Sequence, residues 1–151
     1  MIAIPLIRKS FGRVAGYNMK NMREKGGRLI FSNVASTDAF QIEREFDAVA
    51  ALKPKVKRCA VHLIVALHPD DVDAATDLKF IKWMSQIRNL LGFQDAQTVA
   101  WRHCDKKHPH IHVLLNRVPL AGRAVSIWGK RRMLRELCAK FDKEEGLTPI
   151  T

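Results

Sequence analysis

The chain has 151 residues, of which 47% are hydrophobic and 27% charged, the size and composition of one domain with a single sizeable core. No apolar run approaches the roughly 18 residues that span a bilayer, and no basic region precedes the first apolar stretch, so we expect no membrane segment, no signal peptide and a cytoplasmic location. The 26 Lys and Arg against 15 Asp and Glu residues give a net charge of +11, which favours nucleic acid as partner over an acidic membrane surface.

Strands and helices interleave along the sequence. The predicted strands cover residues 1–7, 28–34, 57–67, 97–103 and 110–118. The predicted helices begin at Ser10, Asp38, Asp70 and about Lys130, and end at Gly26, before Pro54, at Gly92 and at Gly146. The first strand should lie near a sheet edge, because Pro5 cannot donate a backbone hydrogen bond. In the helix after Asp70, an apolar stripe that includes Val72, Leu78 and Met84 is expected to face the core.

This order predicts the fold class. The last two strands flank the short link "CDKKHP", which favours a hairpin. We expect an α+β two-layer sandwich in which helices cover a mainly antiparallel sheet. The domain is predicted to occupy residues 1–151, either as a complete nuclease-sized unit or as the amino-terminal part of a longer protein.

The segment "RHCDKKHPHIHVLLNR" holds most of the chain's 6 histidines. Side chains alternate along a strand, so His110 and His112 share one face while Ile111 and Val113 point to the core. A hairpin would bring His103 opposite that pair. Imidazoles that converge in this way, with coordination positions left open, are typical of a catalytic metal site.

Other residues have a plainer interpretation. His62 is expected to be a hydrogen-bonded core residue and His68 a loop residue. Cys104 follows His103, so alternation should point it away and favour a core position, although it would be a soft metal ligand. The odd number of cysteines, 3, indicates a reducing compartment. Trp101, Trp128 and Phe93 suit base stacking and core packing equally well.

A metal site in a basic domain suggests phosphodiester cleavage. Asp105 is either a turn residue or a carboxylate that orients a ligand histidine or accepts a proton. The chain has 1 tyrosine, Tyr17, which is either a packing residue or a nucleophile.

The segment "HCDKKHPHIHVLLNR" resembles the third motif of conjugative relaxases, the mobilisation nucleases of the HUH endonuclease superfamily, and most closely the branch that includes the T-DNA border endonuclease. "SFGRVAGYNMKN" is similar to the family's first motif, although Asn18 stands where the family commonly has leucine. "VHLIVALHPDD" and "KFDKEEGL" are similar to weaker family segments.

The resemblance implies a metal-dependent, site-specific endonuclease that nicks and rejoins DNA. Tyr17 would attack a single-stranded DNA phosphate at a transfer origin and form a 5′-phosphotyrosine, with Asp105 assisting. His103, His110 and His112 would hold Mg²⁺ or Mn²⁺, with Zn²⁺ as a further candidate, and accessory relaxosome proteins are candidate partners. His108 and Asn116 are expected near the site. The basic residues expected to contact DNA are Arg13, Lys20, Arg23, Arg102, Lys106, Lys107 and Arg117.

Two alternatives remain open at this point. The same chemistry serves replication initiation and transposition, although a tyrosine that precedes the histidine strand favours the relaxase. The other alternative is a non-catalytic DNA-binding module in which His103, Cys104, His110 and His112 bind a structural zinc.

Overall fold

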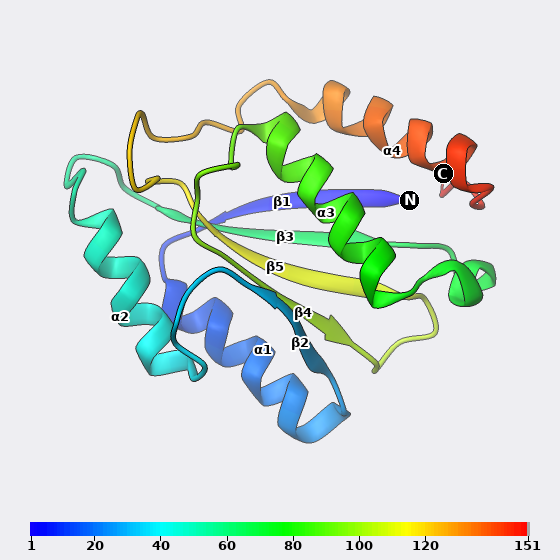
Figure 1. Cartoon of the computed structure of the whole chain (residues 1–151), viewed down its shortest axis with the longest axis horizontal. Coiled ribbons are helices and arrows are strands. Elements are labelled where there is room, and N and C mark those ends of the chain that lie inside the picture. The colour runs from blue at the N-terminus through cyan, green and yellow to red at the C-terminus, as the bar shows by residue number, and fades with distance from the viewer. Residues whose placement is uncertain (151) are drawn as a thin grey trace.

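The computed structural model describes residues 1–150. Strands β1 (Ile2–Arg8), β2 (Arg28–Ser32), β3 (Ala60–Ala66), β4 (Thr98–His103) and β5 (His110–Asn116) form one sheet. The α-helices are α1 (Phe11–Lys25), α2 (Ala39–Ala50), α3 (Asp77–Leu91) and α4 (Arg131–Glu145), and a short 3₁₀ helix, η1 (Pro69–Ala74), precedes α3 (Figure 1).

The sheet has the order β1-β3-β5-β4-β2, and every neighbouring pair is antiparallel. This confirms the predicted α+β class and antiparallel sheet. β1 lies at an edge, as Pro5 indicated, and β4 and β5 form the predicted hairpin. In that hairpin His103 lies opposite His110, and Trp101 lies opposite His112.

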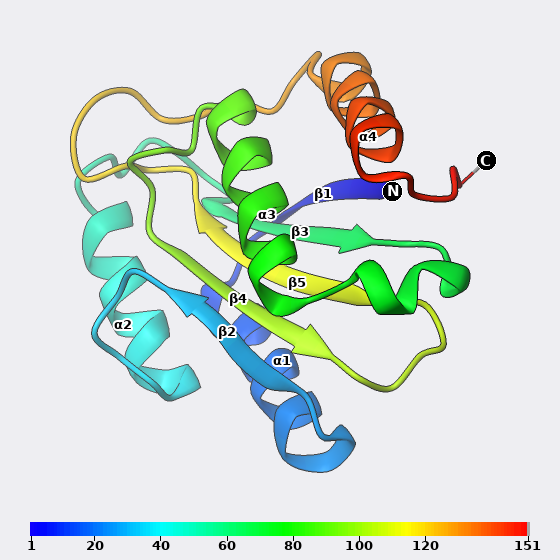
Figure 2. The ribbon, with the colours of Figure 1, turned by 45° about the vertical axis from the view of Figure 1, so that its right-hand side comes forward.

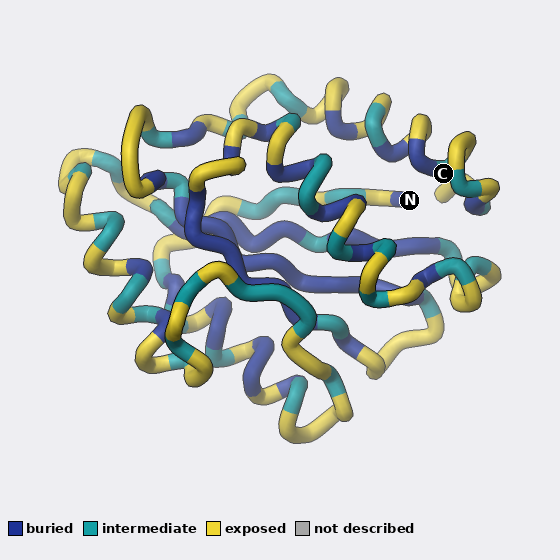
Figure 3. Tube along the Cα trace, in the orientation of Figure 1, coloured by how far each residue is buried: buried dark blue, intermediate teal, exposed yellow. Residues whose placement is uncertain are grey.

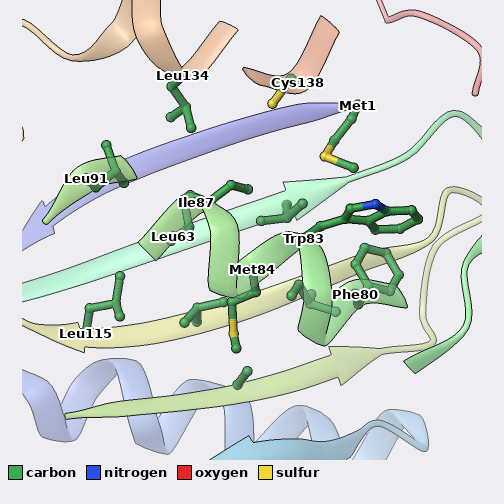
Figure 4. Close-up of a cluster of buried hydrophobic side chains, with 14 of the residues drawn as sticks. Met1, Leu63, Phe80, Trp83, Met84, Ile87, Leu91, Leu115, Leu134 and Cys138 are labelled. Carbon is green, nitrogen blue, oxygen red and sulfur yellow. The ribbon is translucent and has the colours of Figure 1, made fainter. Parts of the chain in front are cut away.

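The helices cover both faces of the sheet, so the molecule has three layers where two were expected (Figure 2). α3 and α4 pack on one face, where Leu63, Trp83 and Leu134 belong to the larger core (Figure 4). α1 and α2 pack on the other face, where Phe46 and Trp101 belong to a smaller core. β3 and β5 carry apolar residues on both of their faces, so other elements must cover the sheet on each side.

Local signals determine where the helices begin and end. The side chain of Ser10 accepts a hydrogen bond from the backbone N–H of Arg13, and Asp38 caps α2 in the same way. α1, α3 and α4 each end at a glycine in the left-handed conformation, where other residues are strained. The predicted stops at Gly26, Gly92 and Gly146 are therefore confirmed.

The single helix predicted from Asp70 to Leu91 is wrong in its first part. Ala75 leaves the helical region, and Thr76 caps a new helix by accepting a hydrogen bond from the N–H of Lys79. This break changes the buried face: Val72 and Leu78 are exposed, whereas Phe80, Trp83, Met84, Ile87 and Leu91 are buried.

Burial is concentrated in the middle of the sheet. Figure 3 shows β3 and β5 buried along almost their whole length, whereas β1 is partly exposed. Across residues 1–150, none of the helices combines the length and the hydropathy needed to cross a membrane.

Candidate metal centre

His103, His110 and His112 converge on the face of the sheet that α1 covers. His103 is the last residue of β4, and alternation along β5 directs His110 and His112 to the same side. All three are buried, and one ring nitrogen from each lies within 4.8 Å of the others. The structure thus brings together the three imidazoles that the sequence predicted.

Tyr17 faces this cluster from α1. The centre of its ring lies 5.7 Å from that of His103 and 5.8 Å from that of His112. Tyr17 is 53% exposed, so a ligand can reach this residue from solvent. Tyr17 also lines an open hollow, called the Tyr17 hollow below, together with Arg8, Lys9, Ser10, Arg13, Val14 and His62.

Hydrogen bonds orient each imidazole and leave one of its nitrogens free. Asn18 donates to the carbonyl of Val14 at 2.9 Å, so its Oδ1 faces His103 and accepts from Nε2–H at 2.6 Å. Nδ1–H of His110 donates to the carbonyl of His108 at 3.0 Å. Nδ1 of His103 and Nε2 of His110 are left with lone pairs.

His112 has a different partner. Its Nδ1 lies 2.6 Å from Nε2 of His62 on the adjacent strand β3, and both rings are buried. When His112 donates this hydrogen bond, its own Nε2 is the nitrogen with a free lone pair. In that arrangement His62 orients the ring of His112, as Asn18 orients the ring of His103.

These residues fit a divalent metal ion. Three buried nitrogen donors lie close together, and each is oriented by a hydrogen bond to its other ring nitrogen, as is usual for metal-bound histidines. Three protein ligands leave coordination positions open, which is the arrangement of a catalytic site.

Burial keeps the histidines neutral. It lowers the pKa of His62 and of His103 to about 4 and that of His112 to about 2, and it also lowers the pKa of His110. Unfavourable interaction with the neighbouring histidines contributes a smaller part of the lowered pKa of His103 and of His112. Neutral imidazole is the form that binds a metal.

Asp105 lies at the rim of the cluster. Its Oδ1 is 3.5 Å from Nε2 of His110 and 4.0 Å from Nδ1 of His103. Its Oδ2 accepts a hydrogen bond of 3.2 Å from Asn21 on α1. Asp105 thus lies beside the two ring nitrogens that carry free lone pairs, at the rim of the candidate metal site.

The basic residues expected at DNA fall into two groups. Arg13 lines the Tyr17 hollow, and Lys20, Arg23, Lys106 and Lys107 are exposed on α1 and on the β4–β5 link.

Arg102 and Arg117 do not belong to that surface. Alternation turns Arg102 to the opposite face, where it pairs with Asp77 at 3.0 Å. Arg117 donates to the carbonyl of Val125 at 2.8 Å and follows the last residue of β5, at the end of that strand opposite to His110.

Two further predicted neighbours have different positions. The rings of His108 and His110 are 4.8 Å apart, so His108 lies beside the cluster, and it holds His110 through its backbone carbonyl. Asn116 is not brought to the cluster. Its amide donates to Phe46 and Gln97, at the end of β5 that α2 covers.

Cys104 is exposed, so the core position predicted for it is wrong. Its sulfur accepts a weak hydrogen bond from Arg28 on β2. Alternation does point it away from His103, as expected. Within residues 1–150, the group that could hold a metal consists of the three histidines without Cys104, which removes the support for the four-ligand zinc module.

Asn18, Asn21 and His62 are the site residues that the sequence did not identify. Asn18 and Asn21 are polar residues on the buried face of α1, and such a position was a detectable signal. The sequence signal for His62 was weaker, because a single histidine in an apolar strand is commonly a core residue whose hydrogen bonds are made within the core.

The fold and the site together define a class of protein: an antiparallel α+β domain with a buried histidine centre, faced by a helix-borne tyrosine in a basic hollow. The family model "Relaxase: MobA/VirD2-like, nuclease domain" matches residues 17–147. The chain therefore belongs to the relaxase family. The match begins at Tyr17 and covers the hairpin and all four strands after β1.

Neither the comparison with curated proteins nor that with solved structures gave a match. The family assignment accordingly depends on the family model.

Proposed function

We propose that residues 1–151 form a relaxase nuclease domain that nicks single-stranded DNA at a transfer origin and later rejoins it. The observation that carries this proposal is the position of Tyr17, half exposed and within 6 Å of two of the clustered imidazoles. Its neighbours in the Tyr17 hollow, Arg8, Lys9 and Arg13, match the negative charge of a DNA backbone.

In this proposal the hydroxyl oxygen of Tyr17 attacks a backbone phosphorus. The bond between the tyrosine oxygen and phosphorus forms, the bond from phosphorus to the 3′ oxygen breaks, and the tyrosine proton passes through solvent or a nearby base to the departing 3′ oxygen. The product is a 5′-phosphotyrosine with a free 3′-hydroxyl. A phosphodiester is present before and after, so a 3′-hydroxyl can reverse the step and rejoin the strand.

His103, His110 and His112 would hold a divalent ion, Mg²⁺ or Mn²⁺ by resemblance and Zn²⁺ by ligand type. The ion would supply Lewis-acid stabilisation of the charge on the phosphate oxygens. Asn18 and His62 orient two of the ligands, and Asp105 stands beside the ring nitrogens with a partner on α1. Arg13 would bind the phosphate backbone, and Lys20, Arg23, Lys106 and Lys107 would extend that contact.

The proposal also includes a role in conjugation and a place in the branch of the T-DNA border endonuclease. Tyr17 precedes the histidine strand in the chain, an order that favours a relaxase over a replication initiator or transposase. The spacing from His103 to His112, with His108 and Pro109 between, supports the branch of the T-DNA border endonuclease. Accessory proteins at the origin would then be partners.

The test is a search for the covalent adduct. Purified protein is incubated with Mn²⁺ or Mg²⁺ and supercoiled DNA from its native genetic context, and protein-linked DNA is separated on a denaturing gel. We expect an adduct that needs the metal, that disappears in Tyr17→Phe and that persists in His68→Ala, a histidine outside the cluster. Nicking by Tyr17→Phe at the wild-type rate would refute the assigned nucleophile.

A further inference from the structure

The loop between β5 and α4 leaves one tryptophan almost entirely in water. Trp128 is 92% exposed, whereas Trp83 and Trp101 are fully buried in the two cores. Burying a large aromatic side chain releases much free energy, so exposed aromatic side chains commonly mark binding surfaces. Covering the indole of Trp128 with a ligand would therefore be favourable.

Trp128 lines a hollow of about 900 Å³ between β1 and the start of α4, called the Trp128 groove here. Apolar residues from β1 and α4, among them Leu6 and Leu134, form part of its wall. Over residues 1–150, every charged residue that lines it is basic: Arg117, Lys130, Arg131, Arg132 and Arg135. The ligand that this surface favours is thus a polyanion.

Most of this charge is uncompensated. Arg132 pairs with Glu136 at 3.0 Å, but both side chains are exposed, and such a pair within one helix is weak. Arg131 and Arg135 form no ion pair within the part of the chain that the structure describes. Two guanidinium groups on one side of α4 are therefore available to phosphates.

Hydrogen bonds to the backbone hold the groove in shape. Nζ of Lys130 donates to the carbonyl of Leu91 at 2.7 Å, and Nε of Arg117 donates to that of Val125 at 2.8 Å. A carbonyl is a neutral acceptor, so both cations keep their charge. The platform around Trp128 is thus formed before any ligand arrives, which lowers the entropic cost of binding.

The Trp128 groove adjoins the Tyr17 hollow. Ile7 lines the groove and Arg8 lines the hollow, and these residues are consecutive on β1, the edge strand of the sheet. Leu6 of the groove lies opposite His62 of the hollow in the pairing of β1 with β3. α4, which lines the groove, and α1, which carries Tyr17, cover opposite faces of the sheet, so a strand that occupies both sites passes around the edge strand β1 (Figures 1 and 2).

We propose that the Trp128 groove is a second binding site for single-stranded DNA, which holds the strand that passes through the Tyr17 hollow around the edge of β1. This inference rests on the proposed function. A base stacks on Trp128, and Arg131 and Arg135 bind the flanking phosphates. Stacking on an aromatic ring together with cationic contacts is the usual means of binding single strands without sequence readout.

The test uses oligo(dT), which has no origin sequence, and two readouts: fluorescence anisotropy of a labelled strand and tryptophan quenching. We expect Trp128→Ala to weaken binding by about 5- to 150-fold, the loss that corresponds to stacking of one base. Phe40→Ala, an exposed aromatic residue outside the groove, is the matched control and should bind like wild type.

The charge is tested separately. Arg131→Ala combined with Arg135→Ala should lessen the salt dependence of binding by about 0.7 in the logarithmic slope for each phosphate that the variant no longer neutralises. Arg44→Ala combined with Lys55→Ala removes the same charge outside the groove and should leave the slope unchanged.

The outcomes separate this proposal from the proposed function. Wild-type affinity in Trp128→Ala, together with normal adduct formation through Tyr17, would overturn the groove and leave the nuclease intact. Weakened binding in Trp128→Ala without any adduct in the wild type would retain the groove and overturn the nuclease. Quenching of Trp128 by poly-glutamate as strong as that by oligo(dT) would overturn the nucleic-acid assignment in favour of an acidic protein segment.

Discussion

On β5, Ile111 and Val113 face α3, whereas His110 and His112 face α1, and all four are buried. The first face is a continuous apolar core closed by α3 and α4. On the second face, buried imidazoles and asparagines lie within a smaller core. Each of these polar side chains needs a hydrogen-bond partner. The same strands therefore serve stability on one face and chemistry on the other.

This division explains how the metal centre can be both buried and polar. Placing neutral imidazoles in a low-dielectric layer costs free energy unless both ring nitrogens are used. The apolar face supplies the stability that offsets this cost, because its side chains bury large areas without polar groups. Substitutions on the two faces should accordingly affect different measured quantities.

The largest expected effect is on the apolar face. Trp83→Ala should lower the free energy of unfolding by about 3–5 kcal/mol, because it removes a fully buried indole and leaves a cavity. Urea denaturation measures the loss. Trp128→Ala, which removes the same side chain from the surface, should change stability by roughly 0.5 kcal/mol or less. Equal losses for the two variants would contradict the burial on which the comparison depends.

On the chemical face, His112→Ala should reduce the rate of nicking by about 10²–10³-fold, as is typical when a group that stabilises developing charge is removed. Metal at about 100 times its dissociation constant should stabilise the wild type by roughly 2.7 kcal/mol, and the variant should lose this gain. Thermal unfolding with and without Mn²⁺ measures it. A metal-induced shift in His112→Ala equal to that of the His68→Ala control would remove His112 from the ligand set.

The orienting residues should have smaller effects. His62→Phe and Asn18→Leu should each weaken metal binding by about 10–100-fold, because a ligand histidine loses its hydrogen-bond partner. Titration calorimetry measures the affinity. His62→Gln keeps an acceptor for Nδ1–H of His112 and should restore much of it. If Gln and Phe weaken binding equally, His62 has a packing role and does not orient the ligand.

The smallest effect concerns Asp77, outside the metal centre. Hydrogen bonds from Arg28, and then from Arg102, hold the pKa of this carboxyl below its ordinary value of 3.8. A lowered carboxyl pKa stabilises the fold above the unfolded-state pKa, and this stability is lost as the pH falls through the folded-state pKa.

Asp77→Asn should therefore lower stability at neutral pH by about 1 kcal/mol or less, since the pairs are partly exposed, and it should weaken the pH dependence in acid. Urea denaturation between about pH 2.5 and pH 6 tests this. Metal affinity should stay at the wild-type value. If the free energy of unfolding falls in acid as steeply in Asp77→Asn as in the wild type, the ion pairs contribute nothing to stability.

The sequence by itself determined the order of strands and helices, because the signals for them are local. Caps such as Ser10 and stops such as Gly146 act within one turn, and alternation along β5 puts His110 and His112 on one face wherever the strand lies. The hairpin then brings His103 to them over a few residues. The three-histidine centre was predictable for that reason.

Tertiary structure decided what no local pattern contains. Asn18 and His62 reach the centre from a helix and a strand that are distant in sequence, and nothing in their own segments indicates the ligand each would meet. Packing also decided which aromatic residue remained outside: Trp101 is covered by α1 and α2, whereas Trp128 stands in solvent beside arginines. Burial depends on which elements pack together, and that choice is made by the whole chain.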